Sequence, residues 1–212
     1  MDELTTTKVN RPLLIGTGND SKFREIEQLL CDLPFQLLNL SHLGLTKVEE
    51  TGATYADNAN LKANTYAQSS NLWTVAEDSG LEVVALNRAP GIYSARHAGR
   101  LASSLERNQK ILSNLNRVTD DNRIARFVCV AVLASPDGRL VHSTEGICSG
   151  SIATKPRGTN GFGYDSIFIP EGFTNTFGEL PTQVKQRISH RARAIAKMRE
   201  LLVRFFDDQK MI

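Results

Sequence analysis

Two adjacent carboxylates, a hydroxyl and a glycine make residues 77–80 (Glu-Asp-Ser-Gly) the segment of this chain best suited to chemistry. They directly follow residues 72–76, which are largely apolar or β-branched and therefore predict a buried strand. We expect that strand to end before the carboxylates, because ionised groups inside a sheet carry a large desolvation penalty. At a strand end, Asp78 and its neighbour can hold Mg²⁺, which prefers oxygen ligands. The alternative is a polar β-turn in which Gly80 adopts a left-handed conformation.

A turn near the start of the chain is suited to binding an anion. Residues 17–22 (Thr-Gly-Asn-Asp-Ser-Lys) follow a strand predicted at 11–16, and apolar residues at helical spacing predict a helix directly after them. Backbone N–H groups and the positive helix end attract anions in this arrangement, and Lys22 adds an ammonium group. The alternative is an ordinary turn in which Asn19 or Asp20 caps the helix.

A second acidic pair, Glu49 and Glu50, precedes a helix predicted over residues 55–69. On that helix, Asn58 and Lys62 are four positions apart and share a face. Beside the first carboxylates, one glutamate can complete a magnesium site, because Mg²⁺ usually takes one or two carboxylates together with substrate phosphate oxygens. The alternative is that these polar residues only face solvent.

The segment from residue 156 to residue 168 is rich in glycine and aromatic residues, which disfavour both a helix and a regular strand. Such a loop can present an aromatic face to a flat ring while its glycines give clearance. The alternative is a surface loop whose aromatic side chains fill the core beneath it.

The last part of the chain, residues 182–206, carries an apolar stripe at helical spacing with a basic face opposite. Ser189 can cap a new helix that follows a short helix at 182–188. An anionic, ring-bearing ligand would then find hydrogen-bond donors here. The candidate donors are Lys185, His190 and Arg191. The alternative is a solvated basic face.

The remaining pattern predicts the scaffold that must position these groups. It indicates a strand around 35–40, a helix over 103–116 with no chemical role, and an apolar strand at 126–134 that is buried on both faces. Ser-Pro-Asp-Gly at 135–138 predicts a hairpin turn that returns into a strand over 140–147.

Composition narrows the class of protein. The chain has 212 residues, 41% hydrophobic and 23% charged, which suits a single domain over residues 11–212 after a flexible start at residues 1–10. A net charge of +2 gives no bulk electrostatic drive toward nucleic acid or membranes. The three cysteines are widely spaced, which does not suggest a disulfide framework. The first residues lack the basic and apolar pattern of a secretory signal. No apolar run approaches the ~20 residues that cross a bilayer. We therefore expect a cytoplasmic protein without disulfides.

Taken together and in this order, the segments resemble the inosine triphosphate pyrophosphatase family, whose members hydrolyse non-standard purine nucleoside triphosphates. The likeness runs from Leu13 to the last helix. The matching segments are TGNDSK (17–22), EETG (49–52), NANLKA (58–63), AEDSGLEV (76–83), APGIYSAR (89–96), GFGYDSIF (161–168) and ISHRA (188–192).

The resemblance implies an elongated α/β fold of two lobes around a long mixed β-sheet, with the active cleft between the lobes. It further implies a homodimer and Mg²⁺-dependent hydrolysis of ITP, dITP or XTP to the monophosphate and pyrophosphate. Which of these substrates is preferred, and whether one or two ions bind, stays open.

The resemblance also implies a role for each matching residue. Asp78 is the catalytic carboxylate and a metal ligand, and Glu49 is the favoured second metal ligand, with Glu50 and Glu77 as the other candidates. The implied phosphate-binding residues are Thr17, Gly18, Asn19, Asp20, Ser21 and Lys22. The other implied substrate-binding residues are Asn58, Lys62 and Ser79, then Phe162, Gly163, Tyr164 and Asp165 for base and sugar, and Lys185, His190 and Arg191 for base carbonyls and phosphate.

Two departures from the family pattern affect this interpretation. Glu77 replaces a common second aspartate, so we assign catalysis to Asp78. Ser166 replaces a proline, which predicts a looser pocket loop. Two other functions compete: a nucleotide sensor, which would not need an acid at position 78, and a nucleic-acid-binding protein, which the near-neutral charge disfavours.

Overall fold

Residues 11–208 are described by the computed structural model, and the predicted flexible start at residues 1–10 lies outside them. Six strands form one mixed sheet in the spatial order β2-β1-β3-β4-β5-β6. β1 pairs in parallel with β2 and β3, whereas β3 to β6 pair antiparallel in succession. The predicted α/β fold around a mixed sheet is therefore confirmed. The strands are β1 Arg11–Ile15, β2 Phe35–Leu38, β3 Thr74–Val83, β4 Ile124–Ala134, β5 Leu140–Ile152 and β6 Phe168–Pro170.

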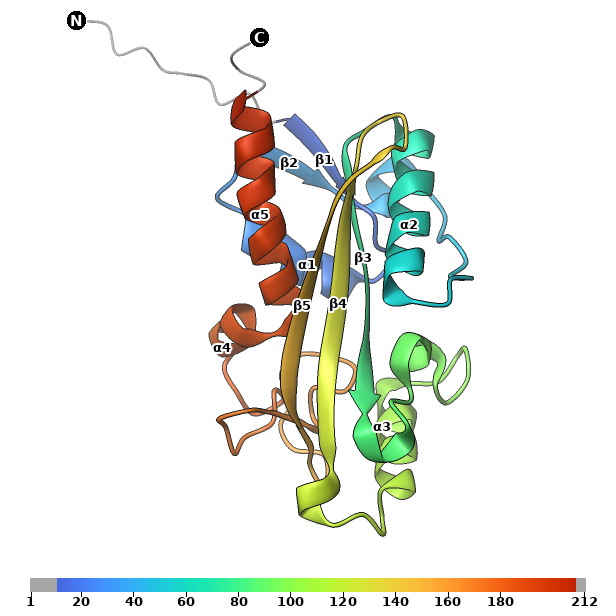
Figure 1. Ribbon diagram of the computed structural model, residues 1–212, viewed down its shortest axis with the longest axis vertical. Coiled ribbons are helices and arrows are strands. Elements are labelled where there is room, and N and C mark those ends of the chain that lie inside the picture. Colours follow the sequence, from blue (N-terminus) through green and yellow to red (C-terminus); the bar gives the residue numbers. More distant parts are fainter. Residues whose placement is uncertain (1–10, 209–212) are drawn as a thin grey trace, which may run out of the picture.

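Helices cover both faces of the sheet (Figure 1). On one face, Ile26 of α1 and Ile195 of α5 share a core cluster with Leu133 of β4. On the other face, the alanines of α2 pack with Val132, the preceding residue of β4. Successive strand residues point to opposite faces, so β4 is buried on both, as its apolar sequence predicts. The α-helices are α1 Asp20–Leu30, α2 Tyr55–Ser70, α3 Ser104–Asn114, α4 Thr182–Ile188 and α5 His190–Asp208, and the 3₁₀ helices are η1 Leu40–Leu43, η2 Val84–Leu86, η3 Gly91–Arg96 and η4 Asp120–Asn122.

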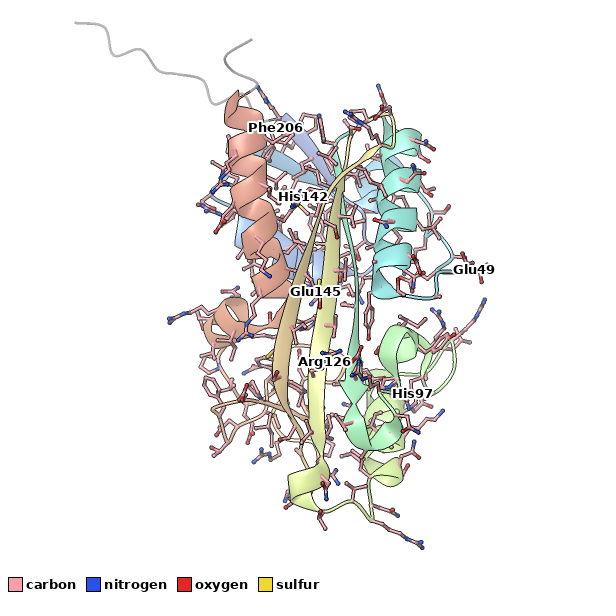
Figure 2. All side chains as sticks on the ribbon, viewed as in Figure 1. Glu49, His97, Arg126, His142, Glu145 and Phe206 are labelled. Carbon is pink, nitrogen blue, oxygen red and sulfur yellow. The ribbon has the colours of Figure 1, made fainter. Side chains whose placement is uncertain are left out.

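The apolar core has two large clusters toward opposite ends of β3 and β4. One contains Val75 and Leu133 together with residues of α1 and α5, and the other contains Leu81 and Phe127 together with residues of α3. The molecule is elongated along β4 and β5 (Figure 1), and Phe206, near the end of α5, belongs to the first cluster (Figure 2). The division into two lobes stays a prediction.

β3 is one uninterrupted strand, so the predicted break after residue 76 is wrong. It pairs with β4 along its whole length, including Glu77 and Asp78. Gly80 is not a left-handed corner, because it lies within the strand, where an added Cβ would come 2.2 Å from the carbonyl oxygen of Gly91. The glycine is needed for the close approach of η3 to the strand.

β1 covers only the first part of β3. Their pairing ends at Val75, opposite Ile15, and the chain then turns away toward α1. Further along the same edge, the N–H of Leu81 donates to the hydroxyl of Ser94 at 2.8 Å, and the N–H of Val83 donates to a loop carbonyl at 3.2 Å. Between these stretches, no strand among residues 11–208 borders the edge of β3. This gap in the sheet is where the pocket described below lies.

Other local patterns are confirmed with small changes of bounds. The predicted hairpin turn joins β4 to β5, and β5 runs past its predicted end at residue 147 because β4 pairs with it as far as Ser151. β6, with three residues, was too short to leave a periodic pattern. The predicted break between α4 and α5 is confirmed, since the hydroxyl of Ser189 accepts the N–H of Ala192 at 3.1 Å.

Candidate active site

Glu77 and Asp78 point to opposite faces of the sheet because they are neighbours in a continuous strand. Glu77 lies on the side of α1 and α5, which bring Lys22 and Arg191 to it. Asp78 lies on the side of α2, which supplies Lys62. Both acids are buried, with 1% and 3% of their surface exposed. The two carboxylates therefore occupy separate environments although they are adjacent in the sequence.

Two side chains of α2 hold Asp78 in place. Asn58 donates from Nδ2 to one carboxylate oxygen at 3.1 Å, and Lys62 donates from Nζ to the other at 3.2 Å. Asn58 in turn accepts the N–H of Gly52 at 2.8 Å, which fixes its amide. Burial raises the pKa of Asp78 in spite of Lys62, and the nearby carboxylate of Glu50 acts in the same direction as burial. Asp78 is therefore a stronger base than an exposed aspartate.

The second acid beside Asp78 is Glu50, whereas the predicted metal ligand Glu49 lies outside the pocket. Lys62 bridges the two carboxylates, with its Nζ 2.6 Å from Oε1 of Glu50, and Arg96 approaches the other oxygen at 3.3 Å. Glu50 lines the pocket together with Asp78. The side chain of Glu49, labelled in Figure 2, is 72% exposed, and it pairs with Arg100, which is also exposed. Two cations thus draw Glu50 inward and leave Glu49 in solvent.

Glu77 is enclosed by cations. Nζ of Lys22 lies 2.8 Å from its Oε1, and Nη2 of Arg191 lies 3.6 Å from the same atom. Burial opposes ionisation, but Lys22 and Arg191 outweigh it and hold the pKa of Glu77 well below the ordinary value of 4.5. Glu77 is therefore ionised at neutral pH, and its role is to orient Lys22, which lines the pocket.

The turn before α1 contributes Asn19 and Lys22 to the pocket. Asn19 is the helix cap, since its Oδ1 accepts the N–H groups of Ser21 at 3.0 Å and Lys22 at 3.1 Å. Because these amides are already bound, an anion here would rely on the ammonium of Lys22 and the positive end of α1. The other residues predicted at this turn do not line the pocket: Thr17, Gly18, Asp20 and Ser21.

The glycine-rich and aromatic loop forms a wall of the same pocket through residues 162–165. Asp165 accepts the N–H of Phe162 at 2.7 Å and forms an ion pair with Lys185. The ammonium of Lys185 lies 4.6 Å from the ring centre of Phe162. Burial raises the pKa of Asp165, although Lys185 opposes this. Lys185 is thus positioned between a carboxylate and an aromatic face.

Hydrogen bonds tie the pocket loop to its neighbours at and beside the position where Ser166 replaces a proline. The hydroxyl of Ser166 accepts from Nδ2 of Asn108 in α3 at 3.0 Å. The hydroxyl of Tyr164 donates to the carbonyl oxygen of Ser94 in η3 at 2.8 Å. Hydrogen bonds to two neighbouring elements therefore hold the segment in the place of a proline ring.

His190 and Arg191 begin α5 at the floor of the pocket. The ring of His190 stacks on Phe127, with ring centres 4.5 Å apart and an interplanar angle of 10°. Burial lowers the pKa of His190 well below its ordinary value, so the ring is neutral. Arg191 bonds Glu25 at 2.6 Å and the hydroxyl of Ser79 at 3.0 Å. Ser79, which also lines the pocket, is thereby tied to the start of α5.

Several residues that line the pocket were not predicted from the sequence. They come from β3 and η3, whose segments 76–83 and 89–96 matched the family pattern, and from β4 and α3, which gave no local signal. The helix predicted over 103–116 to have no chemical role contributes Arg107 of α3 to the lining of the pocket. The missed residues are Gly80, Leu81, Ile92, Ser94, Ala95, Arg107 and Phe127.

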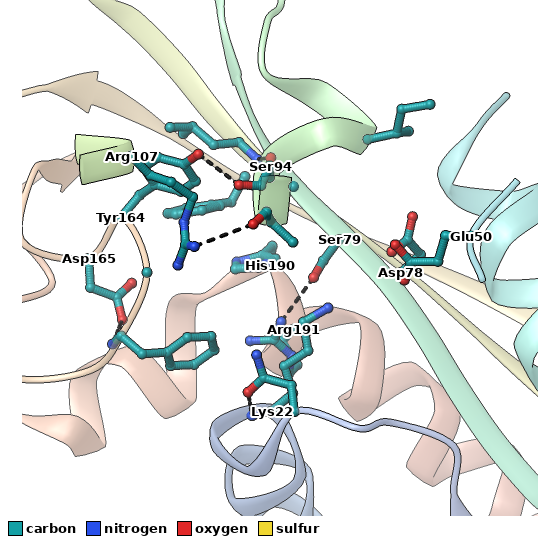
Figure 3. Close-up of a pocket in the computed structure, with 18 of the residues that line it drawn as sticks. Lys22, Glu50, Asp78, Ser79, Ser94, Arg107, Tyr164, Asp165, His190 and Arg191 are labelled. Atoms are coloured by element: carbon teal, nitrogen blue, oxygen red, sulfur yellow. Dashed lines mark hydrogen bonds between the residues drawn. The ribbon is translucent and has the colours of Figure 1, made fainter. Parts of the chain in front are cut away.

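The pocket has two chemically different ends (Figure 3). Asp78 and Glu50 lie at one end, and Tyr164 and Asp165 lie at the other (Figure 3). The pocket spans about 720 Å³ including the space open to solvent, which is the size of a cleft for a small organic ligand. A ligand with a charged, metal-binding tail and a flat, polar ring is complementary to it.

Comparison with known proteins agrees with this chemistry. The sequence profile of the Ham1 family matches residues 13–201. A dITP/XTP pyrophosphatase from Desulforamulus reducens is 42% identical over 200 residues, 94% of this chain and 99% of the relative. One from Haemophilus influenzae is 40% identical over 195 residues, covering 92% and 100%. The solved structure of a HAM1 protein from Coxiella burnetii is 38% identical, with a TM-score of 0.83 over 92% of this chain and 99% of that chain.

Proposed function

Because this chain belongs to the Ham1 family, we propose that it hydrolyses non-standard purine nucleoside triphosphates, dITP and XTP among them, to the monophosphate and pyrophosphate. The observation that carries the proposal is one pocket with Asp78 and Lys22 toward one end and Phe162 and Lys185 toward the other. A triphosphate requires cations and a positioned acid, whereas a purine requires an aromatic face and hydrogen-bond donors. The pocket meets both requirements within a single cleft.

Glu50 and Asp78 are the residues proposed to hold Mg²⁺. Lys62 lies 2.6 Å from one carboxylate and 3.2 Å from the other, so the two acids are close together on the pocket wall. Two carboxylates fit Mg²⁺, which takes its other ligands from water and substrate phosphates. Among the side chains that the structure describes, no cluster of three or more acidic, histidine or cysteine residues is arranged to hold a metal. Bound Mg²⁺ would supply positive charge to the phosphate oxygens.

Asp78 is proposed to orient the attacking water and to accept its proton. Its raised pKa suits a base, and Asn58 and Lys62 fix its two oxygens. The water attacks the α-phosphorus, the bond to the bridging oxygen of the β-phosphate breaks, and pyrophosphate leaves. Lys22, oriented by Glu77, balances negative charge on the phosphates.

Recognition of the base is assigned to Lys185, His190 and Arg191. Nδ1 of His190 and Nε of Arg191 are buried and have no hydrogen-bond partner within the described part of the chain. These two atoms have almost no accessible surface themselves, so the proposal rests on the parts of the three side chains that line the pocket, which carry N–H donors. A 6-oxo purine offers an acceptor to these donors, whereas the 6-amino group of adenine would leave them unpaired.

The decisive experiment measures pyrophosphate release from ITP, dITP, XTP, GTP and ATP in the presence of Mg²⁺. We expect turnover of the first three and kcat/KM for ATP at least about 100-fold lower, because unpaired buried donors discriminate strongly. Equal values for ATP and ITP would contradict the specificity. Absence of pyrophosphate release from every substrate would contradict the reaction itself.

We further propose a homodimer in a reducing, cytoplasmic environment. Cys31, Cys129 and Cys148 are free thiols, which supports a reducing compartment. Val84 and Tyr93 are 59% and 56% exposed and lie on neighbouring elements, so they offer apolar surface to a second copy. Light scattering after size-exclusion chromatography tests the assembly.

Among the helices described, none has both the length and the hydrophobicity needed to cross a bilayer. The predicted lack of nucleic-acid partners stays a prediction.

A further inference from the structure

Three of the four cations that line the pocket are neutralised by carboxylates of the protein. Lys22 lies 2.8 Å from Glu77, and Lys185 and Arg191 lie 2.7 Å and 2.6 Å from the two oxygens of Glu25. The positive charge of these three side chains is therefore partly offset by the protein before a ligand arrives.

Arg107, the fourth cation, has only neutral hydrogen-bond partners in the described structure. Its guanidinium donates to the carbonyl oxygen of Ala95 at 3.3 Å, to that of Ala102, and to the hydroxyl of Ser104 at 3.0 Å. The adjacent acid, Glu106, is bound in the capping box at the start of α3. Arginine has five N–H donors, so two remain for a ligand. Arg107 therefore brings into the pocket free donors and a positive charge that, among the described residues, no carboxylate pairs with at ion-pair distance.

Arg107 enters the pocket at the end that the proposed function assigns to the purine. It binds the carbonyl of Ala95, while Tyr164 binds the preceding carbonyl, that of Ser94. Figure 3 shows Arg107 beside Tyr164, on the opposite side of the view from Asp78. Phosphates held near the carboxylates are therefore not its partner.

The direction from which Arg107 approaches differs from that of the other base-recognition groups. Lys185 and Arg191 reach the pocket from α4 and α5, which lie to the left of β5 in Figure 1, whereas Arg107 reaches it from α3, which lies to the right of β3. The 2- and 6-positions of a purine flank N1 on one ring. Cations on two walls can therefore each meet one of these positions.

We propose that Arg107 is a specificity-determining residue that recognises the 2-position of the purine and favours xanthine. Xanthine has a second carbonyl there and loses a ring proton more readily than hypoxanthine, so it offers both an acceptor and negative charge. Hypoxanthine has only a C–H at this position. Guanine has an amino group, whose N–H donors would face those of the guanidinium. This inference rests on the proposed function and deepens it.

The test compares kcat/KM for XTP, ITP and GTP in the wild type, Arg107→Met and Arg107→Lys. Loss of a charge-assisted hydrogen bond is worth about 1.5–3 kcal/mol, so the XTP-to-ITP ratio should fall about tenfold or more in Arg107→Met. The GTP-to-ITP ratio should rise in the same variant. Arg107→Lys keeps the charge and should retain a higher XTP-to-ITP ratio than Arg107→Met. Arg117→Met, which removes an exposed cation, is the matched control and should leave both ratios unchanged.

Each outcome is decisive because ratios within one variant cancel a uniform loss of folded enzyme. A fall in the XTP-to-ITP ratio of less than about threefold in Arg107→Met, well below the tenfold that one charged hydrogen bond predicts, overturns the inference. So does an equal fall in Arg117→Met, or an equal ratio in Arg107→Lys and Arg107→Met. If the wild type releases pyrophosphate from neither substrate, the proposed function fails and the inference fails with it. If it hydrolyses both, only the role of Arg107 is at stake.

Discussion

Glu77 and Asp78 are adjacent acids, both almost fully buried, and the structure gives them opposite properties. Burial acts on both in the same direction, toward a higher pKa. On the Glu77 face, Lys22 and Arg191 outweigh burial, and the carboxylate is held ionised. On the Asp78 face, Lys62 is shared with a second acid, and burial prevails. Charge compensation therefore decides which of two buried acids is structural and which is free to take up a proton.

Asp78→Asn gives the largest effect expected from this comparison. Loss of the base should lower kcat for ITP by about 10²–10⁴-fold, the usual contribution of general acid–base catalysis. The folded protein should be no less stable, because Asp78 is ionised at a cost and Lys62 keeps its second partner, Glu50. Pyrophosphate release and urea unfolding measure the two quantities. An active variant would show that the base lies elsewhere.

Glu77→Gln should show the reverse pattern. It removes the carboxylate between Lys22 and Arg191 and leaves two cations less well compensated in a buried region. Breaking a buried ion pair from one side typically destabilises a protein by about 3–5 kcal/mol. Urea unfolding should show such a loss, with a smaller fall in kcat than in Asp78→Asn. Unchanged stability together with a loss of kcat as large as that of Asp78→Asn would reverse the assignment of the two acids.

Glu49 and Glu50, the two acids that precede α2, allow a controlled comparison that tests the proposed metal site. Glu50→Gln should raise the Mg²⁺ concentration needed for activity and lower kcat/KM by at least about 10–100-fold, the loss that is typical even when an outer-shell partner of a metal is changed. Glu49→Gln should change neither, because its side chain is 72% exposed. Titration of activity with Mg²⁺ distinguishes the variants. A larger effect from Glu49 than from Glu50 would restore the ligand that the family resemblance favoured.

The smallest expected effect concerns the pH dependence of stability. The pKa of Glu77 is lower in the folded chain than its ordinary value of 4.5, so the unfolded chain binds the proton first as pH falls. The stability that Glu77 contributes is present above that value and is lost as pH decreases below it. Unfolding free energy of the wild type should therefore fall more steeply below pH 4.5 than that of Glu77→Gln. Parallel curves for the two proteins would contradict the lowered pKa.

The helices and the hairpin could be predicted from the sequence because their signals are local. Asn19 caps α1, Ser189 caps the start of α5, and the Ser-Pro-Asp-Gly turn joins β4 to β5. Each depends on residues within a few positions of one another. The family resemblance predicted that segments distant in the sequence share one site. The match to the Ham1 family agrees with that resemblance.

The course of β3 could not be predicted, because the groups that permit it are distant in the sequence. A carboxylate in mid-strand is unfavourable until Lys62, Lys22 and Arg191 arrive from three different helices. The sequence also could not decide between Glu49 and Glu50 as the second acid of the site, because only the folded chain shows which of them Lys62 contacts. Arg107 left no signal at all, because a single arginine on an amphipathic helix normally faces solvent.

Because β1 pairs with only the first residues of β3, the two halves of β3 differ in how they are bordered. Its first residues are the middle of a sheet, while its later residues are a border that strands from another molecule could join. Alternation of backbone direction places the peptide groups of Glu77 and Ser79 on the same border as those of Val75 and Leu81. The turn before α1 and η3, which border the cleft, therefore also cover an unpaired strand edge at which another molecule could add a strand. Variants that loosen η3 or the α1 turn should therefore be more prone to self-association, and a bound nucleotide should counteract this.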